Sequence, residues 1–257
     1  MERGRTIRRV NKVLLVTGGS RGIGAATATL AAQNGYAVCV NYRTNRTAAD
    51  AVVAGIAAAG GTALAVGADV ASEPEVIRLF ETVDAKLGTL AGLVNNAGIL
   101  ERQTRVEHID AARIDRVFAT NVRGAFICAR EAVRRLSTTH GGVGGAIVNV
   151  SSRAAQLGAP GEYVDYAASK AALDALTIGP AREVAGEGIR VNGVRAGIIY
   201  TEIHADGGEP GRVDRLGPTL PMQRGGDAIE VARAILWLLS DEASYSTGAF
   251  IDVAGGR

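Results

Sequence analysis

Short apolar segments alternate with segments of helical pattern along this chain, and that alternation limits the folds open to it. Strands are predicted over residues 13–17, 37–41, 63–66, 93–94, 146–150, 190–194 and 250–253. Helices are predicted over residues 23–34, 47–59, 72–87, 111–136, 164–185 and 229–240. Because the strands are apolar on nearly every residue, we expect a parallel sheet with helices on both faces. Right-handed crossovers then give a single-domain, doubly wound α/β fold of the Rossmann type.

One domain is predicted over residues 12–257, after a basic head of residues 1–11. A chain of 257 residues suits a single α/β sheet wrapped by helices. The head is rich in arginine, and we expect it to be a flexible, solvated terminus. Within the domain, Ser72 and Glu75 have the spacing of a capping box, which predicts that a helix begins there.

Composition and charge argue against several classes of protein. The formal net charge is only +2, which gives no support to a nucleic-acid-binding groove. No apolar run approaches the roughly 18 residues of a membrane span, and the start lacks an apolar signal-peptide core. Cys39 and Cys128 lie in apolar stretches, so we expect reduced packing residues in a cytoplasmic protein. His108, His140 and His204 are scattered, and no metal site is expected.

A glycine-rich segment joins the first predicted strand to the first predicted helix. It reads Thr17-Gly18-Gly19-Ser20-Arg21-Gly22-Ile23-Gly24. Gly18 would permit a tight turn, while Gly22 and Gly24 would let backbone and helix approach a pyrophosphate. The helix N-terminus would add unpaired N–H groups and a positive dipole end. A plain strand–helix turn is the alternative for this motif taken alone.

The residues after the second predicted strand bear on the choice between NAD and NADP. An acidic residue at this place binds the ribose 2′-hydroxyl of NAD. The sequence here is Asn41-Tyr42-Arg43-Thr44-Asn45-Arg46, without a carboxylate. Arg43 can pair with a 2′-phosphate, and Arg21 could approach it from the other side. NADP(H) is therefore the predicted cofactor, although ordinary loop charges would also account for the arginines.

Tyr166 and Lys170 stand four residues apart, on one face of a predicted helix. Lysine occurs elsewhere only at Lys12 and Lys86. Reduction of a carbonyl needs a proton donor as hydride arrives, and a free phenol has a pKa of about 10. Because a nearby ammonium favours the phenolate, Lys170 is expected to lower the pKa of Tyr166 towards the working pH. The alternative is that Tyr166 merely packs on the sheet.

Together these motifs resemble the short-chain dehydrogenase/reductase family, and the resemblance covers nearly the whole chain after Lys12. The matching segments are the glycine-rich turn, Asp69-Val70, Asn95-Asn96-Ala97-Gly98, Asn121, Ser151-Ser152, Tyr166 to Lys170, and the tail from Thr247 to Gly256. Within the family, the chain looks similar to 3-oxoacyl-carrier-protein reductases and glucose dehydrogenases. The resemblance implies a nicotinamide cofactor held at the carboxyl ends of the strands.

It also implies a role for each matching residue. Tyr166 would be the general acid in reduction and the base in oxidation, and Lys170 would lower its pKa and hold the nicotinamide ribose. Ser152 would bond the substrate carbonyl, and Asn121 would anchor a water linking Lys170 to solvent. Residues implied to contact the cofactor are Gly18, Ser20, Arg21, Gly22, Ile23, Gly24, Tyr42, Arg43, Thr44, Asp69, Val70, Asn95, Ala97, Gly98, Tyr166, Lys170, Ile199 and Thr201. Asp69 would contact the adenine, and Ile199 and Thr201 the carboxamide.

Two departures from the family pattern concern the substrate side. Ala196-Gly197 stands where the family usually has Pro-Gly, and the loss of proline should make that turn less rigid. Thirteen residues separate Ser152 from Tyr166, one more than the commonest family spacing, and the extra residue is expected within residues 162–165. Ser151 remains an alternative to Ser152, although Gly158 has the family's spacing from Ser152.

The sequence thus predicts an NADP(H)-dependent enzyme that reduces a ketone or 3-oxo small molecule to a secondary alcohol, reversibly. The segment from Tyr200 to Arg224 is expected to be a mobile lid that sets specificity together with Arg153, Gln156 and Tyr163. The resemblance implies a homotetramer. One rival is an NAD(P)-dependent sugar or polyol dehydrogenase. The other is a non-catalytic NADP-binding sensor or scaffold, which would be expected to lose the tyrosine or the lysine.

Overall fold

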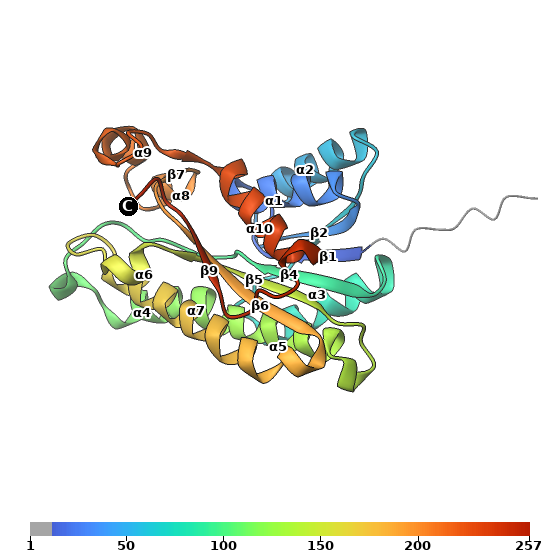
Figure 1. Ribbon diagram of the computed structural model, residues 1–257. Coiled ribbons are helices and arrows are strands. Elements are labelled where there is room, and N and C mark those ends of the chain that lie inside the picture. Colours follow the sequence, from blue (N-terminus) through green and yellow to red (C-terminus); the bar gives the residue numbers. More distant parts are fainter. Residues whose placement is uncertain (1–11) are drawn as a thin grey trace, which may run out of the picture.

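Seven parallel strands form one sheet through the middle of the protein (Figure 1). A computed structural model describes residues 12–257, and the predicted head of residues 1–11 lies outside the described residues. The strands are β1 (Lys12–Val16), β2 (Tyr36–Tyr42), β3 (Thr62–Gly67), β4 (Leu90–Asn95), β5 (Gly145–Ser152), β6 (Ile189–Ala196) and β9 (Phe250–Val253). Their order is β3-β2-β1-β4-β5-β6-β9, so the winding direction reverses between β1 and β4. The predicted doubly wound fold is confirmed.

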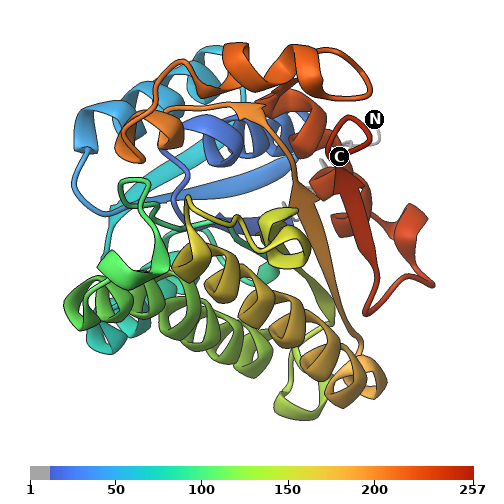
Figure 2. The same ribbon diagram turned by 90° about the vertical axis from the view of Figure 1, so that its left-hand side faces the viewer.

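Helices cover both faces of this sheet, as Figure 2 shows from the side of the strand ends. One layer contains α1 (Gly22–Gln33), α2 (Arg46–Ala58) and α10 (Ala228–Leu239), and the other contains α3 (Glu73–Lys86), α4 (Ala111–Phe118), α5 (Ala125–Leu136) and α7 (Val164–Glu183). Successive strand residues point to opposite faces. Leu14 and Val16 pack in one core and Val13 and Leu15 in the other, all completely buried. A strand buried on both faces explains why the apolar runs lack alternation.

Two helical features differ from the sequence prediction. The helix expected over residues 111–136 has these ends, but a π-helical segment within it, Ala119–Gly124, separates α4 from α5. The predicted capping box is absent, because the Ser72 side chain makes no cap bond. The Glu75 carboxylate instead accepts from the backbone N–H of Asp69 at 2.9 Å. A capping box occurs where none was expected, between Asp227 and Glu230 at the start of α10.

The segment predicted as a lid contains regular structure. It includes α8 (Ile203–Asp206) and α9 (Arg212–Leu216), and the pair β7 (Ile199–Tyr200) and β8 (Gly226–Asp227) brackets it. In Figure 1 these elements gather at the edge of the sheet where α6 (Ala154–Leu157) also lies. Among residues 12–257, no helix has both the length and the apolar character needed to cross a membrane.

Candidate active site

The glycine-rich turn lies where the winding reverses, between the carboxyl ends of β1 and β4. The Thr17 hydroxyl accepts from the backbone N–H groups of Asn96 at 3.0 Å and Ala97 at 3.1 Å. The Asn96 side-chain amide donates to the carbonyls of Thr17 at 2.9 Å and Gly18 at 3.0 Å. Asn96 therefore fixes the shape of the turn. This role of Asn96 was not predicted, although its place directly after a buried strand is a signal in the sequence.

Close contacts require glycine at several places in this turn. Gly18 and Gly22 have φ values of 61° and 51°, a left-handed conformation that glycine adopts without steric cost. A Cβ atom at Gly24 would lie 2.3 Å from the Gly18 carbonyl oxygen and 2.6 Å from the Asn96 amide nitrogen. Gly24 thus lets α1 pack against the turn.

The N-terminus of α1 offers a place for an anion. Its N-cap, Arg21, makes no side-chain cap bond, and its first turn holds no acidic residue. Uncapped N–H groups and the positive dipole end both favour a phosphate there. A groove runs past this helix end, and the predicted cofactor residues that line it are Gly18, Ser20, Arg21, Gly22, Ile23, Tyr42, Arg43, Thr44, Asp69, Val70, Ala97, Gly98 and Thr201.

The end of β2 presents Arg43, and no carboxylate, to this groove. Asn41 is buried; its side-chain oxygen accepts from the N–H of Gly18 at 3.2 Å, and its amide donates to the Ala68 carbonyl at 3.0 Å. Asn41 thereby fastens β2 to the glycine turn and to the end of β3. Arg43 is exposed at the groove, whereas Arg46 pairs with an acid of its own helix. A 2′-phosphate at this place would meet a guanidinium.

Arg21 does not stand free beside the groove, because it forms an ion pair with Asp206 of α8. Glu202 and Asp206 both line the groove, and neither was singled out from the sequence. Any approach of Arg21 to a phosphate, as predicted, would require it to leave Asp206. The ion pair joins the glycine turn to the segment predicted as a lid.

Asn95 is directed into the sheet. Its side chain is buried and donates to Asn149 Oδ1 at 3.0 Å and to the Ala125 carbonyl at 3.2 Å. The Asn149 amide in turn donates to the Thr177 hydroxyl at 2.9 Å. This polar chain braces β4 and β5 against α5 and α7.

Asn121 lies in the π-helical segment and is completely buried. Its side chain accepts from the Ile99 N–H at 2.8 Å and donates to the Ile99 carbonyl and the Ser169 hydroxyl, both at 3.0 Å. It thus connects the segment after β4 to the residue preceding Lys170. The segment also packs closely on the groove, since a Cβ at Gly124 would lie 2.9 Å from Val70 Cγ2. An interrupted helix of this kind is common at functional sites.

Tyr166 and Lys170 face one cavity from successive turns of α7, as their spacing predicts. Lys170 Nζ lies 5.6 Å from the centre of the Tyr166 ring and donates to the Val150 carbonyl at 2.8 Å. Ser151 and Ser152 both line the same cavity. Ser151 is buried, and its hydroxyl donates to the Lys170 carbonyl at 3.2 Å. This geometry favours Ser152 over Ser151 as the hydroxyl that faces a substrate.

The ionisation of this pair differs from the sequence prediction. Burial raises the pKa of Tyr166 to about 12, although the hydrogen bond with Ser152 opposes that change. Burial also lowers the pKa of Lys170 to about 8, against the attraction of Asp174. The expected lowering of the Tyr166 pKa is not found in this structure, because loss of water around the phenol raises that pKa and only the Ser152 hydrogen bond opposes the rise. Tyr166 is a protonated hydroxyl at neutral pH.

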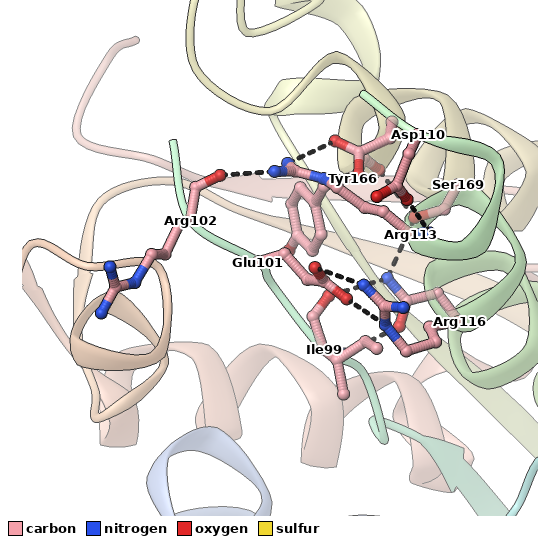
Figure 3. A network of polar contacts seen from close by, with 10 residues as sticks. Ile99, Glu101, Arg102, Asp110, Arg113, Arg116, Tyr166 and Ser169 are labelled. Atoms are coloured by element: carbon pink, nitrogen blue, oxygen red, sulfur yellow. Dashed lines mark hydrogen bonds and ion pairs between the residues drawn. The ribbon is translucent and has the colours of Figure 1, made fainter. Parts of the chain in front are cut away.

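A buried ion pair holds the helix that carries Tyr166 (Figure 3). Arg113 Nε donates to Asp165 Oδ2 at 2.7 Å and Arg113 Nη2 to Asp165 Oδ1 at 3.1 Å. Arg113 Nη1 also donates to the Arg102 carbonyl at 2.6 Å. The two side chains are 9% and 3% exposed, so water scarcely screens the pair. Sequence reasoning missed Arg113, because nothing in the local pattern links it to a residue 52 positions away.

The cavity that holds Tyr166 has a mainly apolar wall beside a charged one. Its apolar lining includes Leu100, Leu157, Tyr163, Ile198 and Ile203. It shares lining residues with the groove along the glycine turn, namely Ile23, Asn96, Gly98, Leu100, Thr201 and Ile203. The two spaces are therefore adjacent, and a molecule in one can contact a molecule in the other.

The two departures from the family pattern both lie in the wall of this cavity. Glu162, in the lengthened segment, accepts from Arg212 of α9 at 2.9 Å, which ties that segment to the predicted lid. Ala196 is the last residue of β6 and is in register with Ser152 and Val253. Alanine keeps the backbone N–H that proline would lack at this place in the ladder.

A family model described as enoyl-(acyl carrier protein) reductase matches residues 18–257. The chain is 61% identical to the uncharacterized oxidoreductase YgfF of Escherichia coli K12, over 95% of this chain and 99% of that protein. It is 37% identical to the 3-oxoacyl-[acyl-carrier-protein] reductase FabG of Staphylococcus aureus Mu50, over 96% of this chain and 98% of that protein.

Solved structures of short-chain dehydrogenases are also similar to this chain. A short-chain dehydrogenase from Burkholderia cenocepacia in complex with NADP superposes with a TM-score of 0.87 at 34% identity, over 97% of this chain and 99% of that chain. A double mutant of the Serratia marcescens short-chain dehydrogenase/reductase superposes with a TM-score of 0.87 at 36% identity, covering 95% and 97% of the two chains. With these likenesses added to the fold, the glycine turn and the Tyr166–Lys170 pair, the chain belongs to the short-chain dehydrogenase/reductase family.

Proposed function

We propose that this oxidoreductase uses NADP(H) to reduce a ketone or 3-oxo compound to a secondary alcohol, and that the reaction is reversible. The observation that carries the proposal is the adjacency of two spaces. The cavity with Tyr166, Lys170 and Ser152 shares part of its wall with the groove along the glycine turn. Substrate and dinucleotide can therefore meet beside a proton donor.

The groove has suitable residues for the pyrophosphate and the 2′-phosphate of NADP(H). The uncapped start of α1 can receive the pyrophosphate, and Arg43 can pair with a 2′-phosphate. Lys170 would hold the nicotinamide ribose, Asp69 the adenine, and Ile199 with Thr201 the carboxamide. When bound, the nicotinamide supplies or accepts the hydride. The Burkholderia relative was solved with NADP, which supports the same cofactor here.

Proton transfer falls to the residues of α7 and β5. The Tyr166 hydroxyl is protonated at neutral pH and would donate to the carbonyl oxygen during reduction, as a general acid does. The Ser152 hydroxyl would bond the same oxygen and orient it. Lys170 adds a positive charge beside the oxygen as negative charge develops there.

Assembly and compartment are part of the proposal. We propose a homotetramer, as the family resemblance implies. The buried thiols of Cys39 and Cys128, with pKa values raised to about 12 by burial, suit the reducing cytoplasm.

A panel of ketones and secondary alcohols, assayed with NADPH and NADH through the nicotinamide absorbance, tests the proposal. Ketone reduction with a higher kcat/KM for NADPH is the expected result. Turnover of sugars or polyols with NAD alone would contradict the proposal and support a sugar or polyol dehydrogenase. Binding of NADPH without any turnover across the panel would support the sensor instead.

A further inference from the structure

Four cationic side chains line the substrate cavity. They are Arg153, Lys170, Arg212 and Arg257, and Glu162 is the one carboxylate side chain found with them in that lining. His204 also contributes to the wall. Burial lowers the pKa of His204, although the hydrogen bond between its Nε2 and the Ile199 carbonyl, 2.9 Å long, opposes that change. The charged part of the wall is therefore net positive.

Two of the three arginines are neutralised by acids that the structure holds in place. Arg212 pairs with both Glu162 and Glu209, and its side chain is 5% exposed. Arg153 Nη1 pairs with Asp252 Oδ2 at 2.8 Å. The positive charges of Arg153 and Arg212 are therefore already balanced by carboxylates of the protein.

Arg257 is different, since within residues 12–257 its guanidinium forms no ion pair with an acid. Its backbone is fixed instead, because its carbonyl accepts from Arg153 Nε at 2.7 Å and its N–H donates to the Ala254 carbonyl at 3.2 Å. Its side chain is exposed; partial desolvation and the charges of Arg212 and Arg153 lower its pKa, and the charge of Glu162 opposes that change. A guanidinium that lies near other positive charges, and has no ion pair of its own among the described residues, would be stabilised by an anion that binds in the cavity.

We propose that the substrate is a carbonyl compound that carries an anionic group, and that Arg257 is the specificity-determining residue that binds this group. The apolar wall, with Leu100, Leu157 and Ile198, would enclose the body of the substrate between the anion and the reacting carbonyl. A carboxylate matches the planar fork of a guanidinium with two parallel hydrogen bonds, and a phosphate does so as well. The inference rests on the proposed function and narrows its substrate class.

A matched pair of ketones gives the first test. Para-acetylbenzoate and its methyl ester have the same reacting carbonyl and differ in the charge of one group. With saturating NADPH, the parent enzyme is expected to favour the acid over the ester by about ten- to a hundredfold in kcat/KM, the range for one hydrogen bond to a charged group. A phosphonate analogue in the same assay shows whether carboxylate or phosphate is the preferred anion.

Variants then assign the preference to a residue. Arg257→Ala is expected to remove most of the preference by raising KM for the acid, while the ester reacts as before. Arg257→Lys keeps the positive charge but lacks the planar fork of the guanidinium. Its preference for the acid over the ester should lie between those of the parent and Arg257→Ala. Arg78→Ala, which removes an exposed arginine of α3, is the control and should leave both substrates unchanged. Equal losses on acid and ester in Arg257→Ala would overturn the assignment.

A binding measurement separates this inference from the proposed function. Calorimetry with the two product alcohols and bound NADPH forms complexes that cannot react, so it needs no turnover. Tighter binding of the acid, lost in Arg257→Ala, supports the anion site even if neither ketone is reduced. Equal affinity for acid and ester in the parent overturns the inference, whether or not the enzyme reduces other ketones.

Discussion

Arg113 of α4 donates two hydrogen bonds, of 2.7 and 3.1 Å, to Asp165, the residue immediately before Tyr166. Both side chains are almost completely buried. The same guanidinium reaches the Arg102 carbonyl, in the strand-end segment beside the groove. The start of α7 is thereby anchored to α4, which lies on the same face of the sheet (Figure 1). The position of the proposed proton donor depends on this pair.

Asp165→Asn should therefore destabilise the protein strongly. It leaves the Arg113 charge buried with a weaker partner, and breaking a buried pair costs about 3–5 kcal/mol. The control is Asp50→Asn, which breaks the exposed Arg46–Asp50 pair at a cost of about 0–1 kcal/mol. Urea unfolding of the variants measures both. Similar unfolding midpoints for the two variants would show that the buried pair contributes no more than a surface pair.

Tyr166→Phe should lower the rate of hydride transfer about a hundredfold or more, as expected for loss of a general acid. NADPH affinity should survive, because the ring remains and Lys170 keeps its place. Tyr163→Phe is the matched control, since that hydroxyl accepts from Gln103 at 2.8 Å in the wall of the same cavity. Stopped-flow absorbance separates chemistry from product release. A near-parental rate in Tyr166→Phe would require a different acid or the sensor hypothesis.

Arg43→Ala should reduce the preference for NADPH over NADH by about ten- to a hundredfold, because a hydrogen bond to a charged group contributes about 1.5–3 kcal/mol. Affinity for NADH, which has no 2′-phosphate, should change little. Arg46→Ala serves as the control, since Arg46 is exposed and already paired with Asp50. Fluorescence titration measures the four dissociation constants. An unchanged ratio in Arg43→Ala would refute the assignment of the phosphate contact.

Binding of NADPH should weaken as pH rises through the pKa of Lys170. That pKa is lowered to about 8 by burial, so the side chain is an ammonium below this pH and an amine above it. A contact that needs the ammonium should be constant below about pH 7 and weaken above about pH 8. In Lys170→Met, affinity should be low at every pH and the inflection should disappear. An inflection that persists in this variant would belong to another group.

Light scattering should return an assembly larger than a monomer at micromolar concentration. Phe126 of α5 is 51% exposed and Ile178 of α7 is 39% exposed, and these helices are expected to pair across a two-fold axis. Phe126→Glu should lower the mass. Val143→Glu, at an exposed loop position, should not. A monomeric parent protein would refute the predicted tetramer.

The sequence by itself determined the sheet, the glycine turn and the placing of Tyr166 and Lys170 on one helix face. Strands buried on both faces leave continuous apolar runs, and a tyrosine and a lysine four residues apart must share a helix face wherever that helix packs. The sharp turn after β1 needs glycine at Gly18 and Gly22 because of backbone sterics, which is a local property. Features of this kind can be read from the residues because their causes lie within a few positions of the chain.

Only the tertiary structure decided the rest, because the causes there are contacts between distant segments. The π-helical interruption at Asn121 lies where that side chain bridges Ile99 and Ser169, and no helical periodicity predicts it. The Glu75 carboxylate accepts from the backbone N–H of Asp69 and does not take part in the predicted capping box. The pKa of Tyr166 depends on how much water the assembled cavity excludes. The guanidinium of Arg257, unpaired within the described part of the chain, becomes visible only once Arg153 and Arg212 have been matched with the carboxylates that pair with them.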